Sequence, residues 1–193
     1  MRWALVRSDV PGLIHFWTIS CYQRLPFFTR DCMREVVVSG LRQLQLRHEV
    51  CLIAYVVMPE HVHVVLLPHG RGRADPMPIE TLFATFKRHV GYYGKQVLRE
   101  VWRQEHRLWT SSLNGWAHDE RGSRSLWTTR GYDFNVTQQA KLCEKIDYCH
   151  KNPVTRRMVE RAEEWKWSSY RFYEFGDESV LRMDWDGRWP IEW

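Results

Sequence analysis

Cysteine is scarce in this 193-residue chain, and the few cysteines form no recognisable pairing pattern. Their number is odd and no two have C-x-x-C spacing; they are Cys21, Cys32, Cys51, Cys143 and Cys149. A disulfide scaffold and a zinc ribbon are therefore excluded. We expect reduced, mostly buried thiols.

Long apolar runs are also absent, and no stretch approaches the length of a membrane span. The first residues, MRWALVRSDVPG, lack the apolar segment and the small-residue cleavage pattern of a signal peptide. Internal repeats and low-complexity stretches are missing too. These absences predict a cytoplasmic globular protein with no membrane partner. The length fits one domain over 1–193.

Positive charge is in modest excess, with a net charge of +5, and it is concentrated in one segment. Between 87 and 130, nine Lys and Arg residues face four acidic residues, an excess equal to that of the whole chain. Aromatic residues alternate with these cations; they are Tyr92, Tyr93, Trp102, Trp109, Trp116 and Trp127. The pattern suits single-stranded nucleic acid, because cations meet phosphates and rings stack on bases. A solvated helix face with its tryptophans turned inward explains it equally well.

Apolar periodicity predicts strands that alternate with helices. The expected strands are 12–24, 50–58 and 62–68, the last two joined by a tight turn at 59–61, with a short strand or extended segment at 125–136. The expected helices are 30–48, 79–100 and 137–152, the last with Thr137 as its N-cap and Pro153 at or just past its end. A Gly/Pro-rich loop follows at 69–78, and 103–125 reads as a loop or insertion.

This order of elements combines a local hairpin with crossover helices. An antiparallel sheet covered by helices, in the ferredoxin-like manner, accommodates both. We therefore predict an α+β fold.

Two histidines stand out in AYVVMPEHVHVVLLP, which spans 54–68. His61 and His63 are two apart in a strand, so both project to the same face, and a pair of imidazoles can hold one metal ion. Their neighbours are almost all apolar, and polar groups in such surroundings usually need a partner or a function. The alternative is a pair of partly exposed histidines on a solvated strand face.

The spacing of these histidines excludes two other histidine-containing motifs. A histidine-triad hydrolase would need a third histidine where Val65 stands, and a zinc protease would place two histidines four apart on a helix. Glu60, next to His61, either tunes the site or caps the turn, and we favour the turn.

A second pair of polar residues lies in EKIDYCHKNPV, at 144–154. Tyr148 and Asn152 are four apart and share one face if the helix reaches Asn152. Pro153 disfavours a helical conformation for the residue before it, so the shared face depends on how the helix ends. Alternatively, Tyr148 packs in the core and Asn152 caps the helix.

Together these segments resemble the HUH single-tyrosine transposases, and in particular the REP-associated tyrosine transposases. MPEHVHVVLLP is similar to the His-hydrophobic-His motif, and YCHKNPV followed by EEWKWSSY is similar to the C-terminal signature of the REP-associated branch. HFWTISCYQRLPFF and LWTTRGYDFNV extend the resemblance over most of the chain. The 103–125 stretch and the extreme C-terminus match nothing in the pattern.

The resemblance implies a ferredoxin-like fold with the catalytic tyrosine on a late helix. It implies that single-stranded DNA is cut and rejoined at REP-like hairpin repeats through a 5′-phosphotyrosine, with a divalent metal, Mg²⁺ or Mn²⁺, as cofactor. His61 and His63 would be metal ligands, Tyr148 the nucleophile, and Asn152 the third ligand, where the insertion-sequence branch often has Gln. A monomer is expected as in the REP-associated branch, although the insertion-sequence branch forms dimers, and a nucleoid-associated location in the cytoplasm follows.

Contacts to the DNA phosphates are expected from a small set of cations in or near the shared segments. These are Lys87, Arg88, Arg130, Lys151 and Arg156. For each one alone, a solvated surface cation is the simpler interpretation.

Two other functions stay open on the sequence. A domesticated descendant could bind hairpin DNA without cutting it. A metal phosphodiesterase that activates water would not need Tyr148.

Overall fold

The computed structural model describes residues 12–48, 50–68, 77–117 and 125–188. Within them, four strands pair in one antiparallel sheet in the order β2-β3-β1-β4. Their bounds are β1 (Ile14–Ser20), β2 (Val50–Met58), β3 (His61–Pro68) and β4 (Tyr132–Val136). With the helices between them, this is the βαββαβ arrangement of the ferredoxin-like fold, so the predicted fold class is confirmed.

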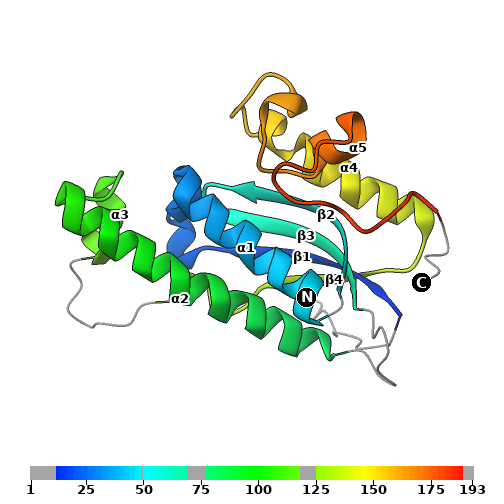
Figure 1. Cartoon of the computed structure of the whole chain (residues 1–193), viewed down its shortest axis with the longest axis horizontal. Helices are drawn as coiled ribbons and strands as arrows, with labels where there is room; N and C mark the ends of the chain where they lie inside the picture. Colours follow the sequence, from blue (N-terminus) through cyan, green and yellow to red (C-terminus); the bar gives the residue numbers. More distant parts are fainter. Residues whose placement is uncertain (1–11, 49, 69–76, 118–124, 189–193) are drawn as a thin grey trace, which may run out of the picture.

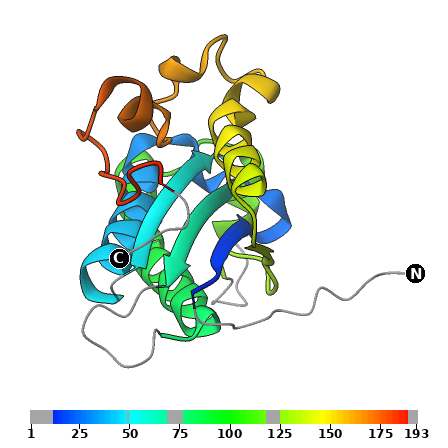
Figure 2. The same ribbon diagram turned by 90° about the vertical axis from the view of Figure 1, so that its right-hand side faces the viewer.

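Helices cover both faces of this sheet (Figures 1 and 2). Those on one face are α1 (Asp31–His48) and α2 (Ile79–Glu105), and α4 (Gln139–Thr155) lies across the other, mainly over β2 and β3. The shorter elements are α3 (Ser111–Ala117), α5 (Tyr170–Phe175) and the 3-10 turns η1 (Tyr22–Arg24), η2 (Phe27–Thr29) and η3 (Ala162–Glu164). Every residue of β2 and β3 is buried, although β2 is an edge strand, because helices cover both faces and the segment around Trp167 and Ser169 bonds the outer side of β2.

Close packing of α1 on α2 depends on Gly40. A Cβ atom at this position would lie 3.0 Å from a Val90 methyl carbon and 3.2 Å from the Phe86 ring. The glycine therefore lets the two helices approach each other while their large side chains pack on the sheet. In the described residues, no helix is both long enough and apolar enough to cross a membrane.

The segment predicted as a loop or insertion at 103–125 is partly helical. Helix α2 continues to Glu105, beyond the predicted end at 100, and α3 follows at Ser111–Ala117. Buried Leu113 anchors α3 in the core, and its N–H donates to the Thr110 hydroxyl. The burial of Leu113 is a tertiary contact, and it leaves no periodic signal in a short polar segment. Residues 118–124, like most of the loop predicted at 69–78, lie outside the described residues.

The end of α4 also differs from the prediction. Pro153 neither ends the helix nor follows it but lies inside its last turn, and Gln138, not Thr137, is the N-cap. Beyond it, the N–H of Met158 donates to the Pro153 carbonyl and that of Arg157 to the Val154 carbonyl, with Arg157 at a φ of 55°. This is a Schellman motif, which satisfies carbonyls at the helix end. The helix therefore passes through Asn152, and Tyr148 and Asn152 lie one turn apart on it.

All five cysteines are free, as predicted. Cys21, Cys51 and Cys149 are buried, Cys32 is half-buried and Cys143 is exposed. Burial raises the pKa of the Cys21 and Cys149 thiols, which keeps them protonated and unreactive.

Candidate active site

Strand register places both histidines of β3 on the face that α4 covers. In the pairing of β3 with β1, His63 lies opposite Thr18 and His61 lies opposite Ser20. The two imidazole rings are 4.6 Å apart between centroids, at 74° to each other, and each residue is only 3% exposed. The alternative of partly exposed histidines on a solvated face is therefore wrong.

Both imidazoles are oriented through Nδ1. The Nδ1 of His63 shares a hydrogen bond of 2.9 Å with the Thr18 hydroxyl, and the Nδ1–H of His61 donates to the Glu60 carboxylate at 3.2 Å. Holding one nitrogen leaves Nε2 as the atom that can bind a ligand. The Nε2 of His63 is buried and has no hydrogen-bond partner, which is unusual for a buried polar atom.

The charge states at this site suit metal binding. Burial, aided by the electrostatic effect of neighbouring His61, lowers the pKa of His63 to about 3, so the His63 imidazole is neutral at pH 7 and a metal need not displace a proton from it. The hydrogen bond from His61 lowers the pKa of Glu60 to about 2, although partial burial opposes this, and Glu60 is therefore a carboxylate. Glu60 thus contacts the site as well as the turn.

Tyr148 projects from α4 directly over this histidine pair. Its ring meets the His63 ring edge-on, with centroids 5.0 Å apart, and the Phe16 ring at 5.9 Å. The residue is 49% exposed. Tyr148 is therefore not a core residue, and a large substrate can reach it from solvent.

Asn152 lies one helical turn beyond Tyr148 and is only 6% exposed. Its Oδ1 is buried and has no hydrogen-bond partner. An unpaired amide oxygen and an unpaired imidazole nitrogen are both electron-pair donors of the kind that bind divalent metals. The described residues contain no group of three or more His, Cys, Asp or Glu able to hold a metal. A metal here would therefore need the amide oxygen and external ligands such as water or phosphate.

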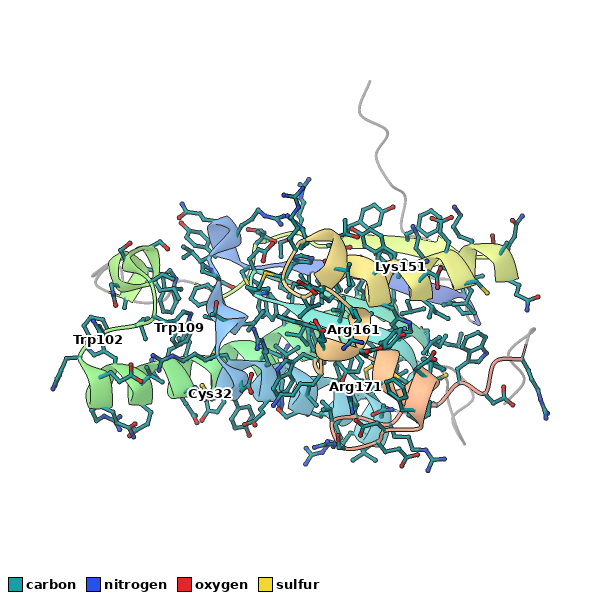
Figure 3. The ribbon with its side chains drawn as sticks, turned by 90° about the horizontal axis from the view of Figure 1, so that it is seen from above. Cys32, Trp102, Trp109, Lys151, Arg161 and Arg171 are labelled. Carbon is teal, nitrogen blue, oxygen red and sulfur yellow. The ribbon has the colours of Figure 1, made fainter. Side chains whose placement is uncertain are left out.

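Some of the cations expected to contact DNA lie near this site. Arg156 caps the end of α4 and lies 3.4 Å from the Glu60 carboxylate, which also pairs with Arg24 at 2.9 Å. Arg130 is exposed and lies two residues before the start of β4. Lys151 is on the outer surface of α4 (Figure 3), where it pairs with Asp147 at 2.7 Å.

The other two expected cations are on α2, on the opposite face of the sheet. The Lys87 ammonium donates to the backbone carbonyls of Thr128 and Thr129, at 2.7 and 3.3 Å, so it anchors the segment that leads to β4. Arg88 is exposed on α2. The structure therefore does not bring these two side chains to the histidine pair.

The aromatic residues of 87–130 divide by type. Trp127 is buried, and Trp102, Trp109 and Trp116 are half-buried against the core, with Trp102 and Trp109 at the end of the molecule that carries α3 (Figure 3). Tyr92 and Tyr93, by contrast, are 61% and 46% exposed. The tryptophans are therefore turned inward, as in the interpretation of this segment as a solvated helix face.

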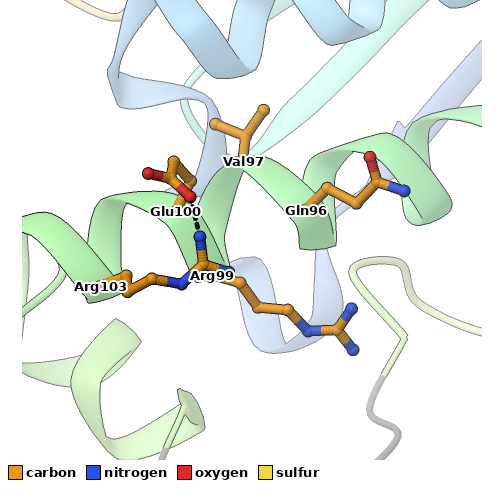
Figure 4. Close-up of a pocket in the computed structure, with 5 residues that line it drawn as sticks. All are labelled: Gln96, Val97, Arg99, Glu100 and Arg103. Carbon is orange, nitrogen blue, oxygen red and sulfur yellow. Dashed lines mark hydrogen bonds and ion pairs between the residues drawn. The ribbon is translucent and has the colours of Figure 1, made fainter.

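A shallow pocket on α2 is not a second candidate. It is lined by Gln96, Val97, Arg99, Glu100 and Arg103, and Arg103 is paired with Glu100 (Figure 4). It contains no histidine, cysteine or tyrosine, and it lies on the helix layer that covers the opposite face of the sheet.

Several residues of the site were not found from the sequence. Thr18, which bonds His63, and Phe16, which packs against Tyr148, both come from β1. Alternation along HFWTIS could have placed Phe16 and Thr18 on one face. Which strand lies beside β3, however, depends on tertiary pairing.

Comparison with known proteins supports the resemblance. No family model matches the chain. A Haemophilus influenzae protein assigned by name to the REP-associated tyrosine transposases is 21% identical over 182 residues, which cover 94% of this chain and 92% of that protein. A solved structure of a REP-associated tyrosine transposase bound to a REP hairpin has a TM-score of 0.61 at 19% identity, and covers 97% of this chain and 93% of that one.

A more distant solved structure, from a Deinococcus radiodurans protein named as a transposase, has a TM-score of 0.44 at 13% identity over 78% of this chain and 98% of that one. That score is too low to support an argument. The predicted resemblance to REP-associated tyrosine transposases is confirmed by the first two proteins, one in sequence and one in fold.

Proposed function

We propose that this protein is a metal-dependent transposase-type endonuclease that cleaves and rejoins single-stranded DNA through Tyr148. The observation that carries the proposal is the contact between a half-exposed tyrosine and a buried histidine whose Nε2 is unpaired. A nucleophile beside a position for a Lewis acid is the arrangement that phosphodiester cleavage by a phenol requires.

The residues present fit a divalent metal. His61 and His63 would hold it through Nε2, and Asn152 through its unpaired Oδ1. Mn²⁺ suits imidazole ligands better than Mg²⁺, and either accepts an amide oxygen. When bound, the metal would neutralise charge on a phosphate oxygen and orient the phosphate for attack.

The covalent step is carried by Tyr148. Its hydroxyl oxygen forms a bond to phosphorus while the bond from phosphorus to the 3′ oxygen breaks, which leaves a 5′-phosphotyrosine and a 3′-hydroxyl. The phenolic proton passes to solvent, which the half-exposed ring can reach, and the leaving oxygen takes up a proton. A free phenol has a pKa near ~10 and is a weak nucleophile at neutral pH, so the phosphate must be activated. Reversal of the same step joins strands without a further energy source.

We infer that the substrate is hairpin DNA of the REP type. Support comes from the names of the two relatives, one of which was solved with a REP hairpin. Cations near the site would contact the phosphates, first Arg156 and Arg130 and then Lys151. One chain carries His61, His63, Tyr148 and Asn152, so a monomer would suffice, and a DNA substrate is consistent with a nucleoid-associated location.

The first prediction tests this function directly. Wild-type protein with Mn²⁺ and a labelled single-stranded hairpin should form a covalent adduct that survives denaturing electrophoresis. The variant Tyr148→Phe should form none, because it lacks the attacking oxygen. The ring itself remains, so its packing on His63 is preserved.

The same assay separates the two alternatives. Tight binding with no cleavage under Mg²⁺ or Mn²⁺ would favour a domesticated binding protein. Cleavage without an adduct, and unchanged in Tyr148→Phe, would favour a phosphodiesterase that activates water. Either result would reject the phosphotyrosine mechanism.

A further inference from the structure

A row of aromatic side chains leads from Tyr148 to the edge of the sheet. Phe16 of β1 lies directly opposite Phe134 of β4, and Tyr148 packs over Phe16 at 5.9 Å. Tyr132 follows on the same face of β4, its ring 6.5 Å from the Phe134 ring and within 7° of parallel. We call Phe16, Phe134 and Tyr132 the aromatic row.

The outer end of the aromatic row is open to solvent. Tyr132 is 40% exposed, and β4 is the edge strand, with no further strand paired to it in the described residues. Helix α4 covers the inner part of the row, where Tyr148 packs on Phe16 and Lys145 lies 5.2 Å from the Phe134 ring, but it leaves Tyr132 exposed. Tyr132 therefore presents its ring to solvent at the open end of the aromatic row.

Positive charge accompanies these rings. The Lys145 ammonium lies 5.1 Å from the centroid of Phe16 and 5.2 Å from that of Phe134. Arg130 is exposed two residues before Tyr132. Cations interleaved with ring faces form the combination that binds single-stranded nucleic acid, through phosphates and bases together.

Tyr132 is also at a suitable distance from the histidine pair. Thr18 lies opposite His63 on one side and opposite Tyr132 on the other, so the three residues form one line across β3, β1 and β4. Two strand spacings separate His63 from Tyr132, roughly 10 Å. The first nucleotides beside a phosphate held at His63 would span this distance.

We propose that Tyr132 is a stacking platform for a nucleobase of single-stranded DNA next to the phosphate that Tyr148 attacks. The proposal rests on the proposed function for the position of that phosphate. Every base has a flat π face, so this contact fixes where the strand lies without selecting a sequence. Because Tyr132 is exposed at the sheet edge, the DNA strand can enter from solvent and lie along the aromatic row towards Tyr148.

Photocrosslinking tests where the base lies. An oligo(dT) strand carrying one 5-iododeoxyuridine is irradiated with the Tyr148→Phe protein in EDTA, so that no cleavage can occur. After trypsin digestion, the crosslink should fall in the peptide 131–141, at Tyr132. Crosslinks confined to other peptides, such as 89–95 with the exposed Tyr92 and Tyr93, would overturn the proposal.

Binding measurements test what the ring contributes. Tyr132→Ala should weaken the Kd for the same oligo(dT) about tenfold, the typical effect of losing one stacked base, and Tyr132→Phe should stay within about twofold of wild type. The matched control is Tyr92→Ala, which removes an even more exposed tyrosine from α2 and should leave the Kd unchanged. Circular dichroism melts confirm that each variant is folded.

The results separate this inference from the proposed function. Equal affinities for wild type and Tyr132→Ala reject the stacking platform, even if the covalent adduct forms at Tyr148. A crosslink at Tyr132 with a tenfold loss in Tyr132→Ala supports it, even if no adduct forms with any metal. Loss of affinity in both Tyr132→Ala and Tyr132→Phe would show that the hydroxyl acts instead of the ring face, and would also overturn the proposal.

Discussion

At the scale of single residues, the hydroxyl of Thr18 decides how His63 is presented. It bonds Nδ1 at 2.9 Å inside a buried site, and the Nε2 on the other side of the ring is unpaired. Without that partner the imidazole could rotate or change tautomer, and both would weaken metal binding. Thr18 would thus position the proposed metal ligand His63 without being a ligand itself.

Replacement of Thr18 by Val keeps the shape of the side chain and removes the hydroxyl. We expect the affinity for Mn²⁺ to fall about tenfold or more in Thr18→Val, measured by isothermal titration calorimetry on the DNA-free protein. Thr18→Ser keeps the hydroxyl and should bind Mn²⁺ within a few-fold of wild type. Equal affinities in the Val variant and the wild type would contradict the positioning role.

At the scale of secondary-structure elements, one buried histidine links α4 to β2 through a hydroxyl group. The Nε2 of His150 shares a hydrogen bond of 2.9 Å with the Ser169 hydroxyl, which in turn accepts the N–H of Tyr55 in β2. Burial lowers the pKa of His150 to about 4, against an opposing effect of Asp147. The docking of α4, which carries Tyr148, therefore depends on a neutral imidazole.

This lowered pKa predicts a dependence of stability on pH. An unfolded histidine has a pKa of about 6.5, so between that pH and about 4 the unfolded chain binds more protons than the folded one, and the free energy of unfolding falls as the pH falls. From pH 7 to pH 5 we expect His150 to account for a loss of about 2 kcal/mol. Urea unfolding of wild type and His150→Gln at pH 7 and pH 5 should show that the variant loses less free energy of unfolding. An equal loss in both proteins would contradict the prediction.

The sequence predicts an element well when local apolar periodicity defines it, and poorly when tertiary contacts stabilise it. The strand 50–58 and the helix 30–48 were predicted closely because their apolar periodicity is local. Helix α3 was missed because its stability comes from buried Leu113, and the helix that carries Asn152 passes through Pro153 because a Schellman motif closes it. Motif spacing predicted His61 and His63 on one face, but the position of Tyr132, two strands away from His63, depends on the pairing of β1 with β3 and β4, which no local pattern encodes.

At the scale of the whole molecule, the sheet divides the cations into two groups. Lys145 and Arg156 lie with the histidine pair and α4, whereas Lys87 and Arg88 lie on α2, which covers the other face of the sheet. In the sequence all of them are basic residues near shared segments, so composition could not separate them. A single strand of DNA bound at Tyr148 would run over the face that α4 covers and would meet only the cations on that face.

This division predicts that two similar substitutions have different effects. Arg156→Gln should weaken hairpin binding and reduce the slope of log Kd against log salt by about 0.7, the loss of one phosphate contact on a single strand. Arg88→Gln removes the same charge from the opposite face and should change neither quantity. Fluorescence anisotropy with a hairpin carrying a single-stranded tail, measured from low to moderate salt, provides both values. If Arg88→Gln reduced the slope as much as Arg156→Gln does, the DNA would have to contact both sides of the sheet, and a path confined to the α4 face would be wrong.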